Sequence, residues 1–286
     1  MAPSQAEAVA PAPVKRGANL RLRVLSSIVL APLVLGAIYA GSPWFEAMVT
    51  LASGLLAREW GRIADGGRLG RASGALVAAV MGVVTLVGVG GPPSAAILLA
   101  VMLTPLLFWW AKQAAGCQAP GWHSAGLLAV ALPCLAMDWL RAHPDHGADT
   151  IFWIVGVVWA TDTGAYIFGR LIGGPKLAPR ISPNKTWAGL LGGALAAGLV
   201  GLVAGMVLQA PSLAVVALVS AGLAVVAQMG DLGESYLKRH FGVKDSGRLI
   251  PGHGGLLDRM DGLLSVTPTV AVLMWATGGH LPLWGA

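Results

Sequence analysis

Residues 188–208 read AGLLGGALAAGLVGLVAGMVL, an apolar run without a single charged side chain. A transmembrane helix needs about 20 mostly apolar residues, so this run is long enough to cross the hydrocarbon core of a bilayer. Its glycines suit the close approach of a second helix, which is how helices associate in lipid. The run therefore predicts a membrane-spanning helix packed against another helix.

The composition of the whole chain extends this prediction. Hydrophobic residues make up 56% of the 286 residues and charged residues only 11%, whereas soluble domains carry about a quarter charged residues. The sequence predicts an all-α polytopic membrane protein with about nine transmembrane helices. The candidate spans lie near residues 24–41, 44–57, 73–90, 95–111, 123–138, 151–169, 188–208, 212–230 and 263–278.

The basic residues predict how these helices are oriented. If the amino terminus lies in the cytoplasm and each span changes sides, the cytoplasmic segments hold every one of the 19 Lys and Arg residues except Arg141. The positive-inside rule predicts this asymmetry. The sequence thus favours a cytoplasmic amino terminus and a periplasmic or outside carboxyl terminus. Membrane orientation and anionic ligands explain the net charge of +6 better than binding of nucleic acid, which we do not expect.

The expected organisation has three parts. Residues 1–23 form a disordered basic tail, residues 24–150 form the amino-terminal transmembrane helices, and residues 151–286 form a catalytic transmembrane region. Cytoplasmic loops are expected at 170–187 and 231–262. Cys117 and Cys134 show no metal-binding or redox spacing, so we interpret both as apolar filler.

Acidic residues gather in the second of these loops. Asp258 and Asp261 are three apart at the start of the last span, and Asp231 and Glu234 have the same spacing. Helical spacing places each pair on one face, and clustered carboxylates suit Mg²⁺. Asp162 lies inside an apolar span, where an acid indicates a functional site. Ordinary interfacial ion pairing is the alternative interpretation of each pair.

Residues 251–255 read PGHGG, a tight turn whose backbone amides, at Gly254 and Gly255, can approach phosphate oxygens. His253 in this turn is either structural or a phosphate donor or proton acceptor.

The loop before residue 188 reads SPNKT over residues 182–186. Ser182 and Thr186 offer hydroxyl groups, and Lys185 offers a cation, so this loop is a second candidate for anion binding. Plain positive-inside anchoring would also explain its charge.

Taken together, these residues resemble the phosphatidate cytidylyltransferase family, whose signature runs S-x-x-K-R-x4-K-D and then P-G-H-G-G-x-x-D-R-x-D. The matching residues are Ser235, Lys238, Arg239, Lys244, Asp245, Pro251, Gly252, His253, Gly254, Gly255, Asp258, Arg259 and Asp261. Residues 162–166 and 182–187 also look like family motifs. The resemblance is sharp from about residue 159 onward and rests on hydropathy before residue 150. Ala188 departs from the pattern, because relatives often carry Glu or Gln there.

The resemblance implies that CTP and phosphatidate react to give CDP-diacylglycerol and pyrophosphate, with Mg²⁺, a second and monovalent cation, and a homodimer. The expected metal ligands are Asp231, Asp258, Asp261 and Asp162. The expected catalytic residues are Asp258, Asp261, Asp231, Lys244 and Asp245. The expected substrate-binding residues are Lys185, Ser182, Thr186, Lys238, Arg239, Arg248, His253, Gly254, Gly255 and Arg259.

The expected location is the cell inner membrane, with the active site facing the cytoplasm, because the lipid headgroup lies at the interface and CTP comes from the cytosol. Three alternatives stay open. Another CTP-dependent lipid enzyme, such as a polyprenol kinase or an archaeal-lipid cytidylyltransferase, would share the nucleotide site. A transporter would use buried acids, although here they gather at one face and no inverted repeat is visible. A scaffold role would explain the spans but not the acid pairs.

Overall fold

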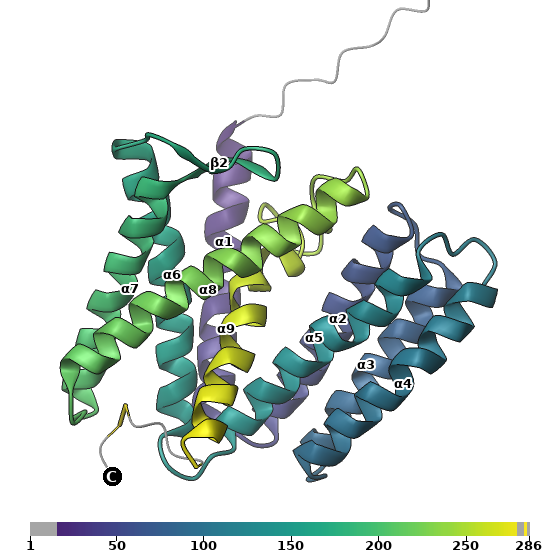
Figure 1. Cartoon of the computed structure of the whole chain (residues 1–286), viewed down its shortest axis with the longest axis horizontal. Coiled ribbons are helices and arrows are strands. Elements are labelled where there is room, and N and C mark those ends of the chain that lie inside the picture. Colours follow the sequence, from purple (N-terminus) through teal and green to yellow (C-terminus); the bar gives the residue numbers. More distant parts are fainter. Residues whose placement is uncertain (1–15, 279–282, 285–286) are drawn as a thin grey trace, which may run out of the picture.

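The computed structural model describes residues 16–278 and 283–284. Over these residues the chain forms nine α-helices and one two-stranded sheet (Figure 1). The elements are α1 (Arg16–Ala40), α2 (Trp44–Ala64), α3 (Arg71–Gly88), α4 (Pro93–Gln113), α5 (Pro120–Arg141), α6 (Gly147–Leu171), β1 (Lys176–Ala178), β2 (Ser182–Thr186), α7 (Trp187–Val207), α8 (Leu213–His240) and α9 (Leu257–Ala276).

Each apolar run identified in the sequence corresponds to one of these helices. Six of them, α3 to α8, are long and apolar enough to cross a membrane by length and composition. The apolar part of α1, Val24–Ala40, is shorter, and α2 and α9 carry charged residues in their polar turns. A multi-pass membrane protein is therefore well supported, while nine spans and the sidedness of the termini stay predictions.

Two predicted boundaries were wrong. Helix α1 begins at Arg16, so residues 16–23 are helical where a disordered tail was expected; residues 1–15 lie outside the described part of the chain. Half of the predicted loop 231–262 is helical as well. Helix α8 continues to His240 and α9 begins at Leu257, which leaves residues 241–256 as the connecting loop. Both errors arise because a helix continues through polar residues beyond the end of its apolar run.

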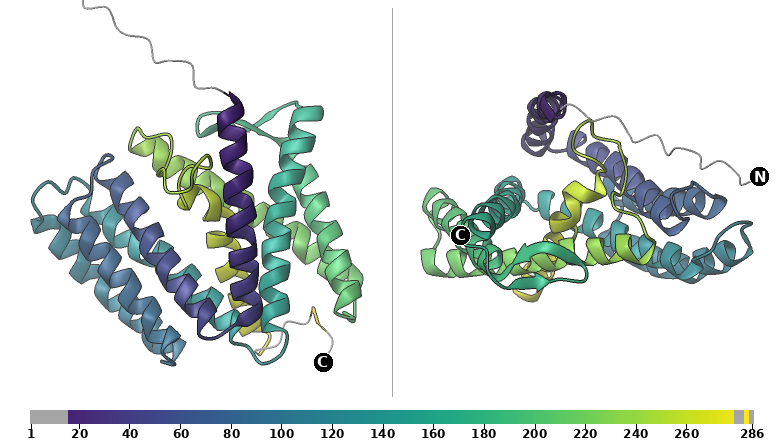
Figure 2. Two further views of the ribbon diagram at one scale, coloured as in Figure 1. Left: turned by 180° about the vertical axis from the view of Figure 1, so that it is seen from behind. Right: turned by 90° about the horizontal axis from the view of Figure 1, so that it is seen from above.

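The helices form two groups with a pair between them. Helices α2 to α5 lie on one side and α6 to α8 on the other, and α1 and α9 lie between the groups (Figures 1 and 2). Helix α5 packs against α2, α3, α4 and α9, which makes it the most buried of the candidate spans. The described core is a continuous cluster of Leu, Val, Ile and Ala side chains contributed by both groups.

Helices α6 and α7 pack closely because small residues face each other. A Cβ atom added at Gly164 would lie 2.7 Å from the carbonyl oxygen of Gly192, and one at Gly193 would lie 2.9 Å from that of Thr161. A Cβ atom at Gly192 would collide with the Phe168 ring. Such contacts are typical of helices that associate in lipid. They hold the start of α7 against the last turns of α6.

A short hairpin connects these two helices, where the sequence predicted a fixed turn. Strands β1 and β2 pair antiparallel, and the sheet ends directly at α7. Thr186 caps α7, because its Oγ1 accepts a hydrogen bond of 3.1 Å from the Gly189 amide. The hairpin lies at the same end of the molecule as the last turns of α8 and the 241–256 loop (Figure 1).

Candidate functional site

Three carboxylates from α8 and α9 converge. Asp231 and Glu234 are three residues apart on one face of α8, and Asp261 lies on α9, which packs against α8. One oxygen from each of the three lies within 4.8 Å of the others. The predicted pairing of distant acids is thus present, with Glu234 in the group and Asp258 outside it among the described residues.

Glu234 contributes one buried oxygen that none of the described residues bonds. Its side chain is 8% exposed, and Oε1 is buried without a hydrogen-bond partner. The other oxygen, Oε2, lies 2.5 Å from Lys238 Nζ. An unpaired buried carboxylate oxygen is costly, and an oxygen-binding cation at the centre of the group would satisfy it. The donor set, all carboxylate oxygen, fits Mg²⁺.

The hairpin supplies a cation to the same group. Lys185 Nζ on β2 lies 2.5 Å from Asp231 Oδ2 and donates to Gln228 Oε1 at 2.9 Å. Ser235 Oγ donates to Asp231 Oδ1 at 3.3 Å. Lys185 therefore lies within the carboxylate group, whereas the predicted role was a contact to substrate phosphate alone.

Asp258 occupies a different position from the one predicted. Its Oδ1 lies 2.6 Å from Lys238 Nζ, and its Oδ2 accepts hydrogen bonds of 3.1 Å from the amides of Ser246 and Gly255. Burial alone would raise the pKa of Asp258, but the bonds from Lys238 and Gly255 lower it to about 2. Asp258 thus bonds to Lys238 and to two amides of the 241–256 loop next to the carboxylate group, and its role as a metal ligand stays a prediction.

Asp261 and Asp162 share a negative environment. Burial and the charges of Asp231 and Asp162 raise the pKa of Asp261 to about 7. Asp261 lies outside the predicted span, which begins at residue 263. Asp162, exposed on α6, interacts electrostatically with Asp231, Lys185 and Arg259. The acid predicted on the sixth span therefore lies beside the carboxylate group. A bound cation would relieve this repulsion.

The PGHGG turn is held from within the chain. The Gly254 amide donates to the Ile250 carbonyl at 3.1 Å, and the Gly255 amide donates to Asp258. His253 Nδ1 lies 2.9 Å from Ser26 Oγ on α1, and Arg259 Nη2 donates to the His253 carbonyl at 2.9 Å. The Gly254 and Gly255 amides are thus bonded within the chain, and the turn contacts Asp258; the approach of these amides to phosphate stays a prediction.

Glu59 on α2 was not predicted as a functional residue. It is 3% exposed, and its Oε2 accepts from the Leu257 amide at 2.8 Å and from Ser246 Oγ at 3.1 Å. It therefore joins the start of α9 to the 241–256 loop. The feature that could have identified Glu59 is an acid directly after an apolar run. The predicted span ended at residue 57, however, and left Glu59 outside any helix.

The other predicted residues surround this group. Lys244, Asp245 and Arg248 are exposed in the 241–256 loop, where a nucleotide from solution can reach them. Arg239 Nη1 donates to the Val243 carbonyl at 3.3 Å, and half-buried Ser182 lies in β2 opposite Ala178. Lys238, predicted to bind phosphate, is held between Glu234 and Asp258.

Comparison with known proteins places this geometry in a family. A phosphatidate cytidylyltransferase of Brucella suis is 39% identical over 250 residues, which cover 86% of this chain and 90% of the relative. One of Staphylococcus epidermidis is 46% identical over 152 residues, covering 53% of this chain and 58% of the relative. The profile of the Cytidylyltransferase family matches residues 21–277. This chain, whose carboxylates, lysines and loop turn lie within the matched region, therefore belongs to the Cytidylyltransferase family.

Proposed function

We propose that this protein transfers the cytidylyl group of CTP to phosphatidate, giving CDP-diacylglycerol and pyrophosphate. The observation that carries the proposal is the convergence of Asp231, Glu234 and Asp261, with Lys185 and Lys238 on either side. Relatives that bear the name phosphatidate cytidylyltransferase support the identity of both substrates.

In this reaction a phosphate oxygen of phosphatidate attacks the α-phosphorus of CTP. A new P–O bond forms, and the bond from the α-phosphorus to the bridging oxygen breaks, so pyrophosphate leaves with the electron pair. Phosphatidate is already ionised, so the protein has no need of a strong base. Its main tasks are to position the reactants and to neutralise charge.

The chain's own residues suit these tasks. Lys185 offers an ammonium group beside the carboxylates, and exposed Lys244 and Arg248 are available for the triphosphate. Asp258 keeps the loop that carries them in place. Asp231, Glu234 and Asp261 would hold Mg²⁺, with Asp162 beside them. Such an ion, when bound, supplies charge neutralisation for the triphosphate and its leaving group.

We also propose nine membrane spans, a cytoplasmic amino terminus and an active site facing the cytoplasm of the inner membrane. Support comes from the basic residues, because with nine alternating spans all Lys and Arg residues except Arg141 fall in the segments assigned to the cytoplasm, the hairpin and the 241–256 loop among them. Residues 151–286 would form the catalytic region, with Glu59 as a contribution from the amino-terminal helices. The homodimer and the second cation rest on the family resemblance alone.

The decisive experiment follows labelled phosphate through the reaction of purified protein with CTP and phosphatidate. We expect label from the α-phosphate of CTP in the lipid product, label from the γ-phosphate in pyrophosphate, and no product in EDTA until Mg²⁺ is restored. Transfer of the γ-label to lipid would instead identify a lipid kinase. Failure to consume CTP under any condition would contradict the proposal and favour a transporter.

Replacing Lys185 with Met should lower kcat/KM by about 5- to 150-fold, since a hydrogen bond to a charged group is worth about 1–3 kcal/mol. The loss should be smaller than that of a metal-binding carboxylate. Initial rates over a range of CTP concentrations measure it. Lys112→Met at the end of α4 is the matched control and should behave as wild type. Equal rates for both variants would remove Lys185 from the site.

A further inference from the structure

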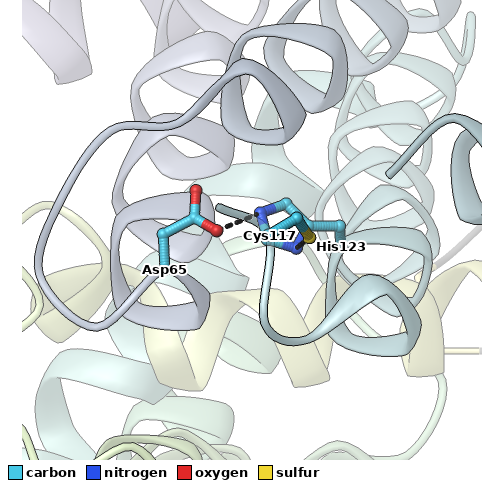
Figure 3. A group of neighbouring side chains, drawn as sticks. All are labelled: Asp65, Cys117 and His123. Atoms are coloured by element: carbon cyan, nitrogen blue, oxygen red, sulfur yellow. Dashed lines mark hydrogen bonds and ion pairs between the residues drawn. The ribbon is translucent and has the colours of Figure 1, made fainter. Parts of the chain in front are cut away.

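A second cluster of metal-ligating side chains lies in the amino-terminal half of the protein. Asp65 follows the end of α2, Cys117 lies between α4 and α5, and His123 lies in the first turn of α5. One ligand atom from each lies within 4.8 Å of the others (Figure 3). This cluster shares no residue with the carboxylate group of α8 and α9, and nothing in the proposed reaction uses it.

The hydrogen bonds of His123 leave one ring nitrogen facing a carboxylate. The side chain is completely buried, with an exposed fraction of 0%. Its Nδ1 lies 3.1 Å from the Ala119 carbonyl oxygen, which only accepts, so Nδ1 carries a proton. Nε2 lies 3.3 Å from Asp65 Oδ1, and neither atom has a hydrogen-bond partner. Two buried acceptors that face each other require a positive charge between them, either a proton or a metal ion.

The second oxygen of Asp65 is held in the way typical of a metal ligand. Asp65 Oδ2 accepts hydrogen bonds from Ser73 Oγ at 2.6 Å and from the Gly70 amide at 3.1 Å. Both Asp65 and His123 thus have one atom fixed by outer partners and the other directed at the shared space. Metal sites show this arrangement, because outer hydrogen bonds orient the ligands.

We propose that Asp65, Cys117 and His123 bind a zinc ion, with Asp65 Oδ1, the Cys117 thiolate and His123 Nε2 as ligands and water in the fourth position. Sulfur, imidazole nitrogen and carboxylate oxygen together suit Zn²⁺ rather than Mg²⁺. The 3.3 Å between Asp65 Oδ1 and His123 Nε2 fits two ligands each about 2.0–2.2 Å from one ion. On this proposal Cys117 is a metal ligand and not the apolar filler that its spacing suggested.

Binding requires a small change at Cys117. Its Sγ lies 3.7 Å from His123 Nδ1, so the proposal includes a rotation of the Cys117 side chain toward Nε2. Burial raises the pKa of the Cys117 thiol, so the metal-free protein holds a neutral thiol. Zinc binding then forms the Zn–S bond and releases the thiol proton to solvent.

The ion would stabilise the contact between the amino-terminal helices α2 and α5 and the end of α8. The residue next to His123, Trp122, accepts a hydrogen bond of 2.7 Å from Trp60 Nε1 through its carbonyl oxygen. Its ring packs against His240 and Phe241, with centroids 5.2 Å and 5.8 Å away. Zinc would therefore fix α2 and α5 against the end of α8, where the 241–256 loop begins.

The test uses the full-length protein, purified in detergent and stripped with a chelator, then dialysed against Zn²⁺ or Co²⁺. We expect about one zinc per chain, a thiolate-to-cobalt charge-transfer band in the near ultraviolet, and a higher unfolding temperature with zinc. Cys117→Ala should abolish the band and the temperature shift and lower zinc affinity at least about tenfold. Cys134→Ala, which removes the other cysteine, is the matched control and should keep all three properties.

The variant Asp261→Asn distinguishes ions bound at the carboxylates of α8 and α9 from ions bound at the proposed zinc site. It should leave the thiolate-to-cobalt band unchanged. Equal zinc affinity and no thiolate band in wild type and Cys117→Ala would overturn the proposal. So would a wild type that binds no zinc, because the charge between Asp65 and His123 would then be a proton. None of these readouts depends on catalytic activity, so this proposal and the proposed function can fail separately.

Discussion

Replacing Asp261 with Asn should reduce formation of CDP-diacylglycerol by at least about a thousandfold and leave the protein folded. Asp261 is one of three carboxylates whose oxygens lie within 4.8 Å of one another. An amide removes one negative charge from the site proposed to hold the ion that neutralises the triphosphate. A metal ion in that role supplies several kcal/mol, and about 4 kcal/mol corresponds to a thousandfold in rate. The measurement is kcat in the CTP assay at several Mg²⁺ concentrations.

The same substitution should also raise the Mg²⁺ concentration that gives half-maximal rate. Asp145→Asn, in the turn between α5 and α6, makes the same chemical change outside the site and is the control for folding and insertion. Wild-type turnover by the Asp261 variant at low Mg²⁺ would remove the metal assignment. An equal effect of the two substitutions would show that the loss is not specific to the site.

Replacing Glu59 with Ala should both destabilise the protein and slow the reaction. Ala leaves the Leu257 amide and Ser246 Oγ, both now bonded to Glu59 Oε2, without a buried acceptor. Each such loss costs about 1–3 kcal/mol. Because Ser246 also donates its amide to Asp258, we expect the 241–256 loop to lose its fixed position and kcat to fall more than KM rises. Thermal unfolding in detergent and steady-state kinetics measure the two effects.

Glu59→Gln distinguishes this positioning role from a role of the charge itself. Gln keeps a carbonyl oxygen for both donors, so it should recover most of the stability and the rate. If Gln is as impaired as Ala, the charge of Glu59 matters beyond the hydrogen bonds. An Ala variant with unchanged stability and rate would show that the loop is held by other contacts.

The sequence predicted the helices well because most of the apolar runs are long and contain few charged side chains. It also predicted that acids of α8 would meet acids of α9, since three-residue spacing fixes a helix face. It did not predict the different contacts of Asp258 and Glu234. That distinction depends on Lys238, which reaches both carboxylates, and on the Ser246 and Gly255 amides, which are paired with Asp258. Spacing along a helix contains none of this information.

Contacts between segments far apart in the sequence could not be predicted either, because helix spacing describes only neighbouring residues. Glu59 meets residues almost two hundred positions away, and only the packing of α2 beside α9 reveals it. Asp65, Cys117 and His123 come from three separate elements, so no short motif marks them. In both cases the residues that matter are near in space and unremarkable in sequence.

The tight seam between α6 and α7 limits the routes by which a lipid can arrive. Gly164 and Gly193 leave no space for even a methyl group between these helices, and Gly192 is closed off by Phe168. No fatty-acid tail can slide through that seam toward Lys185 and Asp231. A two-tailed substrate has to enter between a different pair of helices. Larger side chains placed along α1 or α9 would identify the entry route, because those that block it should slow the reaction.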